Sequence, residues 1–454
     1  MNLYPYQQQG VSFLVEKQQA LLADEVGLGK TYQALDACRQ LEARRVLVLC
    51  PAILKYQWQA EINKFFPSAT TAVVAGSQKQ RIPLWGGDQE FTIANYELLL
   101  RDFACVASEI WDVIIADEAT RISNPRAKQT KALKRLQARY KFALTGTPFT
   151  NSVENIWSIM DWLVPDLLGN WWQFINTYCV KNYWNAVVGY RNLDVMREKI
   201  RPFMLRRTKH EVMAELPEII STDISLVMSE TEKKLYNRLR SELLFEISRE
   251  DINKIENPTT IANAMVKMVR LKQLTCSSEL LGESTESTKL EALKELLPMW
   301  INGERKAIIF TQFSKFADIL ERELTDYSPL KITGEVKDRE NILDLFNNKS
   351  KHRLLIMTSA GQYGLNIQAA SVVVHADQEW SLGKMTQRLG RAHRIGQKQT
   401  VLEYNLICKG TIDMYVRKVL RKKQELSDFM IEAHGVETHG VGAQEIREIL
   451  NYSG

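Results

Sequence analysis

Residues 24–31 (Asp-Glu-Val-Gly-Leu-Gly-Lys-Thr) are expected to form a short loop with two glycines that can bind a phosphate group. The loop follows an apolar run and opens a helical pattern, so its backbone N–H groups can close around a triphosphate. We predict that Lys30 reaches the outer phosphates and that Thr31 holds magnesium. Asp24 stands where the usual phosphate-loop pattern has glycine, which leaves a charged loop before a helix as the alternative.

Two adjacent carboxylates, Asp117 and Glu118, follow the apolar run at residues 113–116. The run predicts a buried strand, and open parallel sheets bind their ligands at the carboxyl ends of such strands. Asp117 can join the magnesium shell while Glu118 polarises an attacking water. A helix N-cap would use the same residues. Residues 145–149 (Thr-Gly-Thr-Pro-Phe) end a further strand and suit either a sensor of the γ-phosphate or a plain turn.

A basic run at residues 387–397 contains Arg391 and Arg394, which lie three residues apart and so are expected on one helical face. The second half of the chain lacks a phosphate loop of its own. We predict that its two guanidinium groups clamp the γ-phosphate bound by the first half, as an arginine finger does. Residues 384–423 hold eleven Lys and Arg against two carboxylates. This excess is typical of a polyanion site, although a basic surface helix is the alternative.

Apolar runs alternate with helical patterns in both halves, which predicts an α/β protein with two parallel-sheet lobes. The expected strands are residues 46–50, 91–94, 113–116 and 141–144, then 307–310, 354–357, 372–374 and 401–402. The predicted domains are lobe one at 1–225 with a helical insertion from about 156, a helical insertion and linker at 226–288, and lobe two at 289–454.

Composition limits the broad class of the protein. The chain has 454 residues, 45% of them hydrophobic and 25% charged, which is typical of a globular protein of two domains. No apolar run is long enough to span a bilayer, and the first ten residues lack the pattern of a signal peptide, so we expect a cytoplasmic protein. Six scattered cysteines and six histidines without ligand spacing argue against disulfides and structural zinc.

Taken together, these motifs resemble the Swi/Snf ATPase family of the superfamily 2 helicase-like motors, over nearly the whole chain. In that family an acidic residue does occupy the position of Asp24, and the run Arg-Ala-His-Arg-Ile-Gly-Gln at residues 391–397 is highly specific. The other matching segments are residues 6–7, 51–58, 93–97, 145–148, 203–209, 310–313 and 358–366. The resemblance implies two RecA-like lobes, ATP and Mg²⁺ in the cleft, and duplex DNA crossing both lobes.

Carried over residue by residue, the resemblance implies three groups of site residues. The ATP-binding residues are Gln7, Asp24, Glu25, Gly27, Leu28, Gly29, Lys30, Thr31 and Gly364, with Thr31 and Asp117 as magnesium ligands. The catalytic residues are Lys30, Asp117, Glu118, Arg391 and Arg394. The expected contacts to the DNA backbone are Lys55, Gln57, Arg206, Arg207, Gln312, Ser359 and Trp380.

The chain departs from the family pattern in three places. Thr120 replaces a histidine in the acidic box, residues 380–382 read Trp-Ser-Leu instead of Trp-Asn-Pro, and residues 362–363 are Gln-Tyr instead of small residues. We expect a monomeric, ATP-driven DNA translocase or helicase without a chromatin-reading segment. Branched DNA in replication, recombination or repair is its first expected substrate. The alternatives are displacement of proteins from DNA and an ATP-gated DNA clamp that does not travel.

Overall fold

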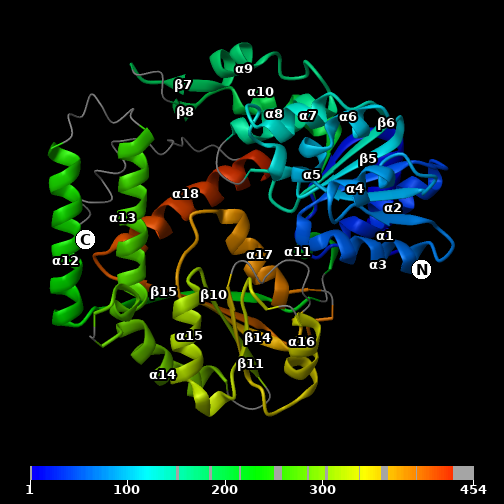
Figure 1. The fold of residues 1–454 in the computed structure, drawn as a ribbon. Coiled ribbons are helices and arrows are strands. Elements are labelled where there is room, and N and C mark those ends of the chain that lie inside the picture. Colours follow the sequence, from blue (N-terminus) through cyan, green and yellow to red (C-terminus); the bar gives the residue numbers. More distant parts are fainter. Residues whose placement is uncertain are drawn as a thin grey trace. The chain divides into compact units, whose positions relative to one another are not determined.

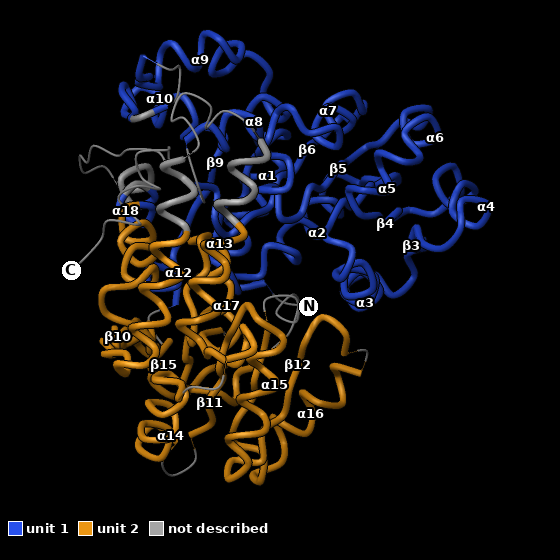
Figure 2. Tube along the Cα trace, turned by 60° about the vertical axis from the view of Figure 1, so that its left-hand side comes forward, with its two compact units in different colours: residues 1–215, 423–440 blue, residues 216–422, 441–454 orange. Residues whose placement is uncertain are grey.

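The computed structural model describes residues 3–149, 153–183, 187–213, 216–249, 258–283, 286–301, 305–336, 338–358, 367–394 and 396–432. The chain divides into two compact units, coloured blue and orange in Figure 2. Unit 1 comprises residues 1–215 and 423–440, and unit 2 comprises residues 216–422 and 441–454. Each unit is built on its own parallel sheet (Figure 1).

The sheet of unit 1 has seven strands in the order β3-β4-β2-β5-β6-β1-β9, and every described pair is parallel. Continuous apolar sequence produces its central strands, because a parallel strand is covered on both faces. The strands are β1 (Gln19–Leu22), β2 (Val46–Cys50), β3 (Thr71–Val73), β4 (Phe91–Asn95), β5 (Trp111–Asp117), β6 (Ala138–Leu144) and β9 (Met204–Leu205).

Alternate side chains of these strands enter two separate hydrophobic cores. Leu47 and Leu49 of β2 pack in one core, whereas Val46 and Val48 pack in the other. The second core is closed by α1 (Pro5–Lys17), α2 (Lys30–Gln40) and α3 (Lys55–Phe65). The first is closed by α5 (Tyr96–Arg101), α6 (Phe103–Ala107), α7 (Lys128–Lys134), α8 (Glu154–Leu163), α9 (Trp171–Tyr178) and α10 (Leu193–Ile200). Unit 1 also contains α4 (Gln78–Arg81), α11 (Lys209–Val212) and the antiparallel pair β7 (Cys179–Lys181) and β8 (Val187–Tyr190).

The sheet of unit 2 has six parallel strands in the order β10-β15-β14-β11-β13-β12. They are β10 (Ile219–Leu226), β11 (Lys306–Thr311), β12 (Leu330–Ile332), β13 (Leu354–Thr358), β14 (Ala370–His375) and β15 (Val401–Cys408). One face packs on α14 (Thr288–Trp300) and α15 (Ser314–Glu323), and the other on α16 (Arg339–Asn348) and α17 (Leu382–Ala392). A further core joins α12 (Glu230–Arg249), α13 (Pro258–Cys276) and α18 (Ile412–Glu432).

The predicted fold class, two parallel α/β lobes, is confirmed. Two details of the expected helical insertion differ. Strands β7 and β8 pair antiparallel within it, and residues 219–226, which the predicted boundary at 225 left almost entirely in lobe one, form β10 of the second sheet. The units accordingly divide between residues 215 and 216. None of the described helices combines the length and the apolar character needed to cross a membrane.

Candidate nucleotide-binding site

The phosphate loop lies between the end of β1 at Leu22 and the start of α2 at Lys30. Two of its glycines have positive φ, 97° at Gly27 and 73° at Gly29, a region that residues with a side chain rarely adopt. A Cβ on Gly29 would also lie 2.4 Å from the side-chain nitrogen of Gln7. Gly29 caps α2, so the positive end of the helix dipole and its first N–H groups face the loop. This local geometry suits an anionic phosphate.

Gln7 closes one side of the loop from α1. Its side-chain amide donates to the carbonyl of Leu28 at 3.3 Å, and the hydroxyl of Tyr6 donates to the same carbonyl at 3.4 Å. Gln7 is buried, and its amide oxygen accepts from the backbone N–H of Tyr4 at 3.0 Å. The structure therefore places Gln7 directly against the phosphate loop, beside the position where a nucleotide would bind.

Lys30 turns back over the loop. Its ammonium donates to the carbonyls of Asp24 at 2.6 Å and Glu25 at 3.2 Å, and it lies 3.5 Å from the position that a Cβ on Gly146 would take. Burial lowers the pKa of Lys30, and the carboxylate of Asp24 is the largest opposing influence. Phosphate oxygens could replace these two carbonyls as acceptors and would favour the charged ammonium.

The acidic pair lies at the carboxyl end of β5, the edge of the sheet at which a ligand is predicted to bind. The indole N–H of Trp58 donates to one oxygen of the Asp117 carboxylate at 2.8 Å, and the backbone N–H of Glu118 donates to the other at 2.9 Å. The hydroxyl of Tyr96 fixes the carbonyl of Asp117 at 2.7 Å. Glu118 has left-handed backbone angles, φ 50° and ψ 56°, which turn the chain sharply after Asp117.

Burial raises the pKa of Asp117, although the hydrogen bonds from Trp58 and Glu118 and the charge of Lys30 each lower it. A bound cation would remove this destabilisation of the carboxylate. The donor set also fits magnesium, which prefers carboxylate and hydroxyl oxygens together with water. Asp117 and the hydroxyl of Thr31, the second residue of α2, are the groups that would hold the ion.

The loop at residues 145–149 belongs to the same site. A Cβ on Gly146 would lie 2.5 Å from the side chain of Val26, so only glycine allows this close approach to the phosphate loop. The hydroxyl of Thr145 accepts from the N–H of Thr147 at 3.2 Å and shapes the turn. The loop therefore lies next to the phosphate loop, a position that a sensor of the γ-phosphate requires and that a plain turn can also take.

The two predicted arginine fingers lie in unit 2 and do not share a helical face. Helix α17 ends at Ala392, so Arg391 is its penultimate residue while Arg394 lies beyond its C-cap at His393. A spacing of three residues gives a shared face only within a helix, and the backbone leaves the helix at His393, with φ −87° and ψ 86°. Arg391 is buried with 8% of its surface exposed, and Arg394 is partly exposed.

Four of the predicted DNA contacts lie in unit 1, and three of these, Lys55, Arg206 and Arg207, are hydrogen-bonded inside the protein. The ammonium of Lys55 is buried and donates to the carbonyl of Val74 at 2.7 Å. The guanidinium of Arg207 is buried against the carboxylate of Asp24. Neither side chain is therefore presented to an external phosphate. Sequence alone does not separate buried from exposed cations, which is why both residues were expected to contact DNA. Gln57 is exposed on α3, and Arg206 is partly exposed.

The predicted DNA contacts in unit 2 border the end of β14. The side-chain amide of Gln312 donates to Asp377 at 2.9 Å, and Trp380 packs edge-on against Tyr415 with the ammonium of Lys272 5.9 Å from its ring centre. Arg388 is fully buried with Asp377 close by, so part of the basic excess in residues 384–423 is internal. Ser359 and Gly364 lie outside the described residues.

Sequence reasoning missed the residues that hold the acidic pair and the loop. Trp58 and Tyr96 were grouped with short motifs of their own, and neither has a pattern that links it to Asp117, which lies 59 and 21 residues away. Gln33 was also missed; its amide donates to Asp24 at 3.1 Å and to the carbonyl of Leu28 at 3.2 Å. The available signal was the position of this amide side chain, on the first turn of the helix that follows the phosphate loop.

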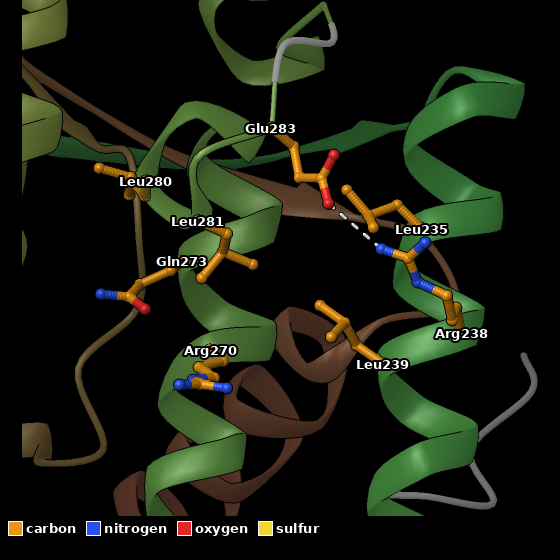
Figure 3. A pocket seen from close by; sticks show the side chains of 8 residues that line it. All are labelled: Leu235, Arg238, Leu239, Arg270, Gln273, Leu280, Leu281 and Glu283. Carbon is orange, nitrogen blue, oxygen red and sulfur yellow. Dashed lines mark hydrogen bonds and ion pairs between the residues drawn. The ribbon is translucent and has the colours of Figure 1, made fainter.

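Unit 2 holds a hollow of about 390 Å³ between α12, α13 and the 3₁₀ turn η6 (Ser278–Leu281), shown in Figure 3. Leucine side chains line it, and Arg238 forms an ion pair with Glu283 across one side at 3.2 Å. Figure 3 also shows Arg270 and Gln273 along α13 at its edge. The lining residues include no glycine-containing loop that could bind a phosphate, and we assign the hollow no part in the nucleotide site.

Two parallel-sheet lobes, with a phosphate loop and an acidic pair at the carboxyl edge of the first, define a phosphate-loop protein of the two-lobed RecA-like class. A model of the SNF2-related domain matches residues 6–280, and the helicase conserved C-terminal domain matches residues 288–396. The chain belongs to the SNF2-related family, and the resemblance to Swi/Snf ATPases of superfamily 2 is confirmed.

Relatives of known description match along most of this chain. A protein of Mycoplasma pneumoniae, described as an uncharacterized ATP-dependent helicase, is 33% identical over 94% of this chain and 42% of its own length. The ATPase of the ISWI chromatin-remodeling complex of Saccharomyces cerevisiae is 28% identical over 95% of this chain and 41% of its own length. This chain thus spans less than half of either relative. The solved SWI2/SNF2 ATPase core of Sulfolobus solfataricus in complex with dsDNA is 28% identical, with 100% of this chain and 98% of that one covered and a TM-score of 0.46.

Proposed function

We propose that this protein binds and hydrolyses ATP with Mg²⁺ and uses the cycle to move along duplex DNA. The observation that carries the proposal is the grouping of Lys30, Gly146 and the acidic pair around one phosphate loop in unit 1. Family membership supports it, as does the description of a relative as an ATP-dependent helicase. Phosphoryl transfer needs this combination of positioning and charge neutralisation more than covalent chemistry.

Each residue has a role in this scheme. Lys30 and the N-terminus of α2 bind the outer phosphates, while Thr31 and Asp117 hold the metal ion. Mg²⁺ supplies charge neutralisation at the phosphates when it is bound. Glu118 orients and polarises the attacking water, and its left-handed backbone turns the chain sharply after Asp117. Arg391 and Arg394 of unit 2 complete the site when the lobes close.

Translocation follows from alternating grip on DNA. ATP favours a closed state because it is bound from both lobes, and hydrolysis removes that differential affinity. The grip falls on the phosphate backbone, since a motor that travels cannot depend on sequence. Gln57, Gln312, Ser359 and Trp380 remain the proposed contacts. Neutralising about six phosphates would lower the affinity for DNA by roughly 10³ between 50 and 200 mM salt.

We rank branched DNA first among substrates, with fork reversal, junction migration or unwinding in replication, recombination or repair as the outcome. Displacement of proteins from DNA is the second candidate, which the similarity to a chromatin-remodeling ATPase favours. A clamp that binds DNA without travelling is the third. We infer that the protein acts as a monomer in the cytoplasm, with nucleoid or viral DNA.

ATP hydrolysis measured without DNA and with single strands, duplex, forks and four-way junctions tests the proposal. We expect stimulation by duplex DNA and a further increase with branched substrates, which should also be migrated or unwound. Triplex displacement on linear duplex separates a translocase from a static clamp. Lys30→Ala should abolish hydrolysis, and Arg391→Ala should spare ATP binding but lose stimulated turnover. Absence of any DNA-stimulated hydrolysis in the wild-type protein would refute the proposal.

A further inference from the structure

Residues 204–209, which we call the strap, run beside the phosphate loop in unit 1. Strand β9, at the start of the strap, pairs in parallel with the last residues of β1, Leu21 with Met204 and Leu22 with Leu205. The backbone pairing continues beyond the sheet: Ala23 N–H donates to the carbonyl of Leu205 at 2.7 Å. The N–H of residue 25 then donates to the carbonyl of residue 207 at 2.9 Å. The strap therefore follows the loop itself and not only the strand before it.

Arg206 joins the two loops of the nucleotide site. Its guanidinium donates to the carbonyl of Ala23 at 2.9 Å and to the carbonyl of Gly146 at 3.0 Å. The first carbonyl belongs to the entry of the phosphate loop and the second to the proposed γ-phosphate sensor. A movement of either loop must therefore move Arg206 or break one of these hydrogen bonds.

Arg207 explains why an aspartate stands at the first position of the loop. Its Nε donates to one oxygen of the Asp24 carboxylate at 3.0 Å, and its Nη2 donates to the other. The same guanidinium donates to the side-chain oxygen of Gln33 at 2.8 Å, and the amide of Gln33 in turn donates to the carbonyl of Leu28. Asp24 is completely buried, and a buried carboxylate needs such a partner. Asp24, Gln33 and Arg207 form one network that supports both ends of the loop.

Lys209 makes the third connection. Its backbone N–H donates to the carboxylate of Glu25 at 2.8 Å, and its ammonium forms an ion pair with the same carboxylate at 3.4 Å. Only 4% of the Lys209 surface is exposed. Three basic residues within four positions of the strap are thus each committed to the nucleotide site of their own unit.

We propose that Arg206, Arg207 and Lys209 are positioning residues that hold the phosphate loop in its binding shape, and that the strap responds to nucleotide occupancy of this loop. The proposal rests on ATP binding at the site described above. The strap also leads toward the second unit, because the chain passes into unit 2 at residue 216. A change in the conformation of the phosphate loop would therefore also change the conformation of the segment that leaves unit 1.

Nucleotide binding without DNA is the first test, made on the full chain with Mg²⁺ and a fluorescent ATP analogue. Arg207→Ala should weaken nucleotide binding at least tenfold. The affinity of Arg207→Lys should lie between those of Arg207→Ala and the wild type, since lysine keeps the charge but loses the bidentate contact. Arg201→Ala is the matched control, because this arginine is exposed and lies just before the strap, and it should bind as wild type does. DNA affinity of the nucleotide-free protein should be unchanged in Arg207→Ala. Unchanged nucleotide affinity combined with weaker DNA binding would overturn the proposal and restore Arg207 as a DNA contact.

Hydrogen exchange on the wild-type protein is the second test and needs no variant to fold. The Lys209 amide, which donates to Glu25, is the reporter; its exchange should slow at least fivefold when the analogue saturates the site. Exchange in residues 204–209 that stays the same at saturation would overturn the response to nucleotide. If the wild-type protein binds no nucleotide at all, the proposed function fails instead, so the two failures are distinct.

Discussion

Replacing Trp58 with phenylalanine removes the indole N–H that donates to the Asp117 carboxylate at 2.8 Å, while an aromatic ring remains in the core. A hydrogen bond to a charged group contributes about 1.5–3 kcal/mol, and one pKa unit corresponds to about 1.4 kcal/mol. Asp117 is partly exposed, so solvent screening favours the lower end of this range. We therefore expect the pKa of Asp117 to rise further in Trp58→Phe.

The sign of the effect follows from the groups around the carboxylate. Burial already raises the pKa of Asp117, and the bond from Trp58 is the largest influence that lowers it. Without that bond the carboxylate takes up a proton at a higher pH. A protonated Asp117 cannot hold Mg²⁺, so ATP hydrolysis should begin to fall at higher pH in Trp58→Phe than in the wild type.

The pH profile of kcat/KM for DNA-stimulated ATP hydrolysis is the appropriate assay, because this ratio reports the pKa values of the free enzyme. The acid limb should move to higher pH in Trp58→Phe, with activity recovering at pH 8. Trp172→Phe is the control, since Trp172 is 68% exposed on α9 and should leave the profile unchanged. A folded Trp58→Phe protein with an acid limb at the wild-type position would refute the reasoning.

Three further predictions concern single side chains. Glu118→Gln should bind ATP and DNA but hydrolyse at least 10²-fold more slowly, measured by single-turnover kinetics, and normal turnover would show that the acidic pair is misassigned. Gly146→Ala should weaken nucleotide binding severalfold in an equilibrium titration, because its Cβ would lie 2.5 Å from a side chain of the phosphate loop; unchanged affinity would mean that this contact is easily relieved. Lys289→Met leaves Asp413 buried without the cation now 2.7 Å away, so unit 2 should lose about 3–5 kcal/mol in urea unfolding, whereas the exposed Lys294→Met should lose less than about 1 kcal/mol.

The strands that sequence reasoning located were those with continuous apolar runs. Residues 46–50 form β2 with the predicted bounds, because both faces of a central parallel strand are covered. Strand β10 was missed because its residues 219–226 mix apolar and polar types without a regular pattern and are all exposed or partly exposed at the edge of the second sheet. An edge strand is only partly covered, so its sequence lacks the continuous apolar run that identifies a buried strand.

The phosphate loop and the acidic pair were found because their chemistry is local in sequence. The positions of charged side chains were harder to predict. Lys55 and Arg207 have the residue type of a DNA contact, but each is buried against an acceptor, Val74 or Asp24, that lies far away in the sequence. Arg394 was misplaced for a different reason, since a spacing of three residues implies a shared face only while the helix continues.

The pairing of β10 with β15 has a consequence for how the chain folds during its synthesis. All the strands of the first sheet have emerged by residue 205, but β10 meets its neighbour only when residues 401–408 arrive; Asp223 and Asn405, which bond across this pair, are 182 residues apart. At about 5–20 residues per second the ribosome needs roughly 9–36 seconds to supply that distance. During this interval the first unit can complete its sheet. Strand β10 meanwhile has no partner strand, which makes the nascent second unit the more vulnerable to aggregation.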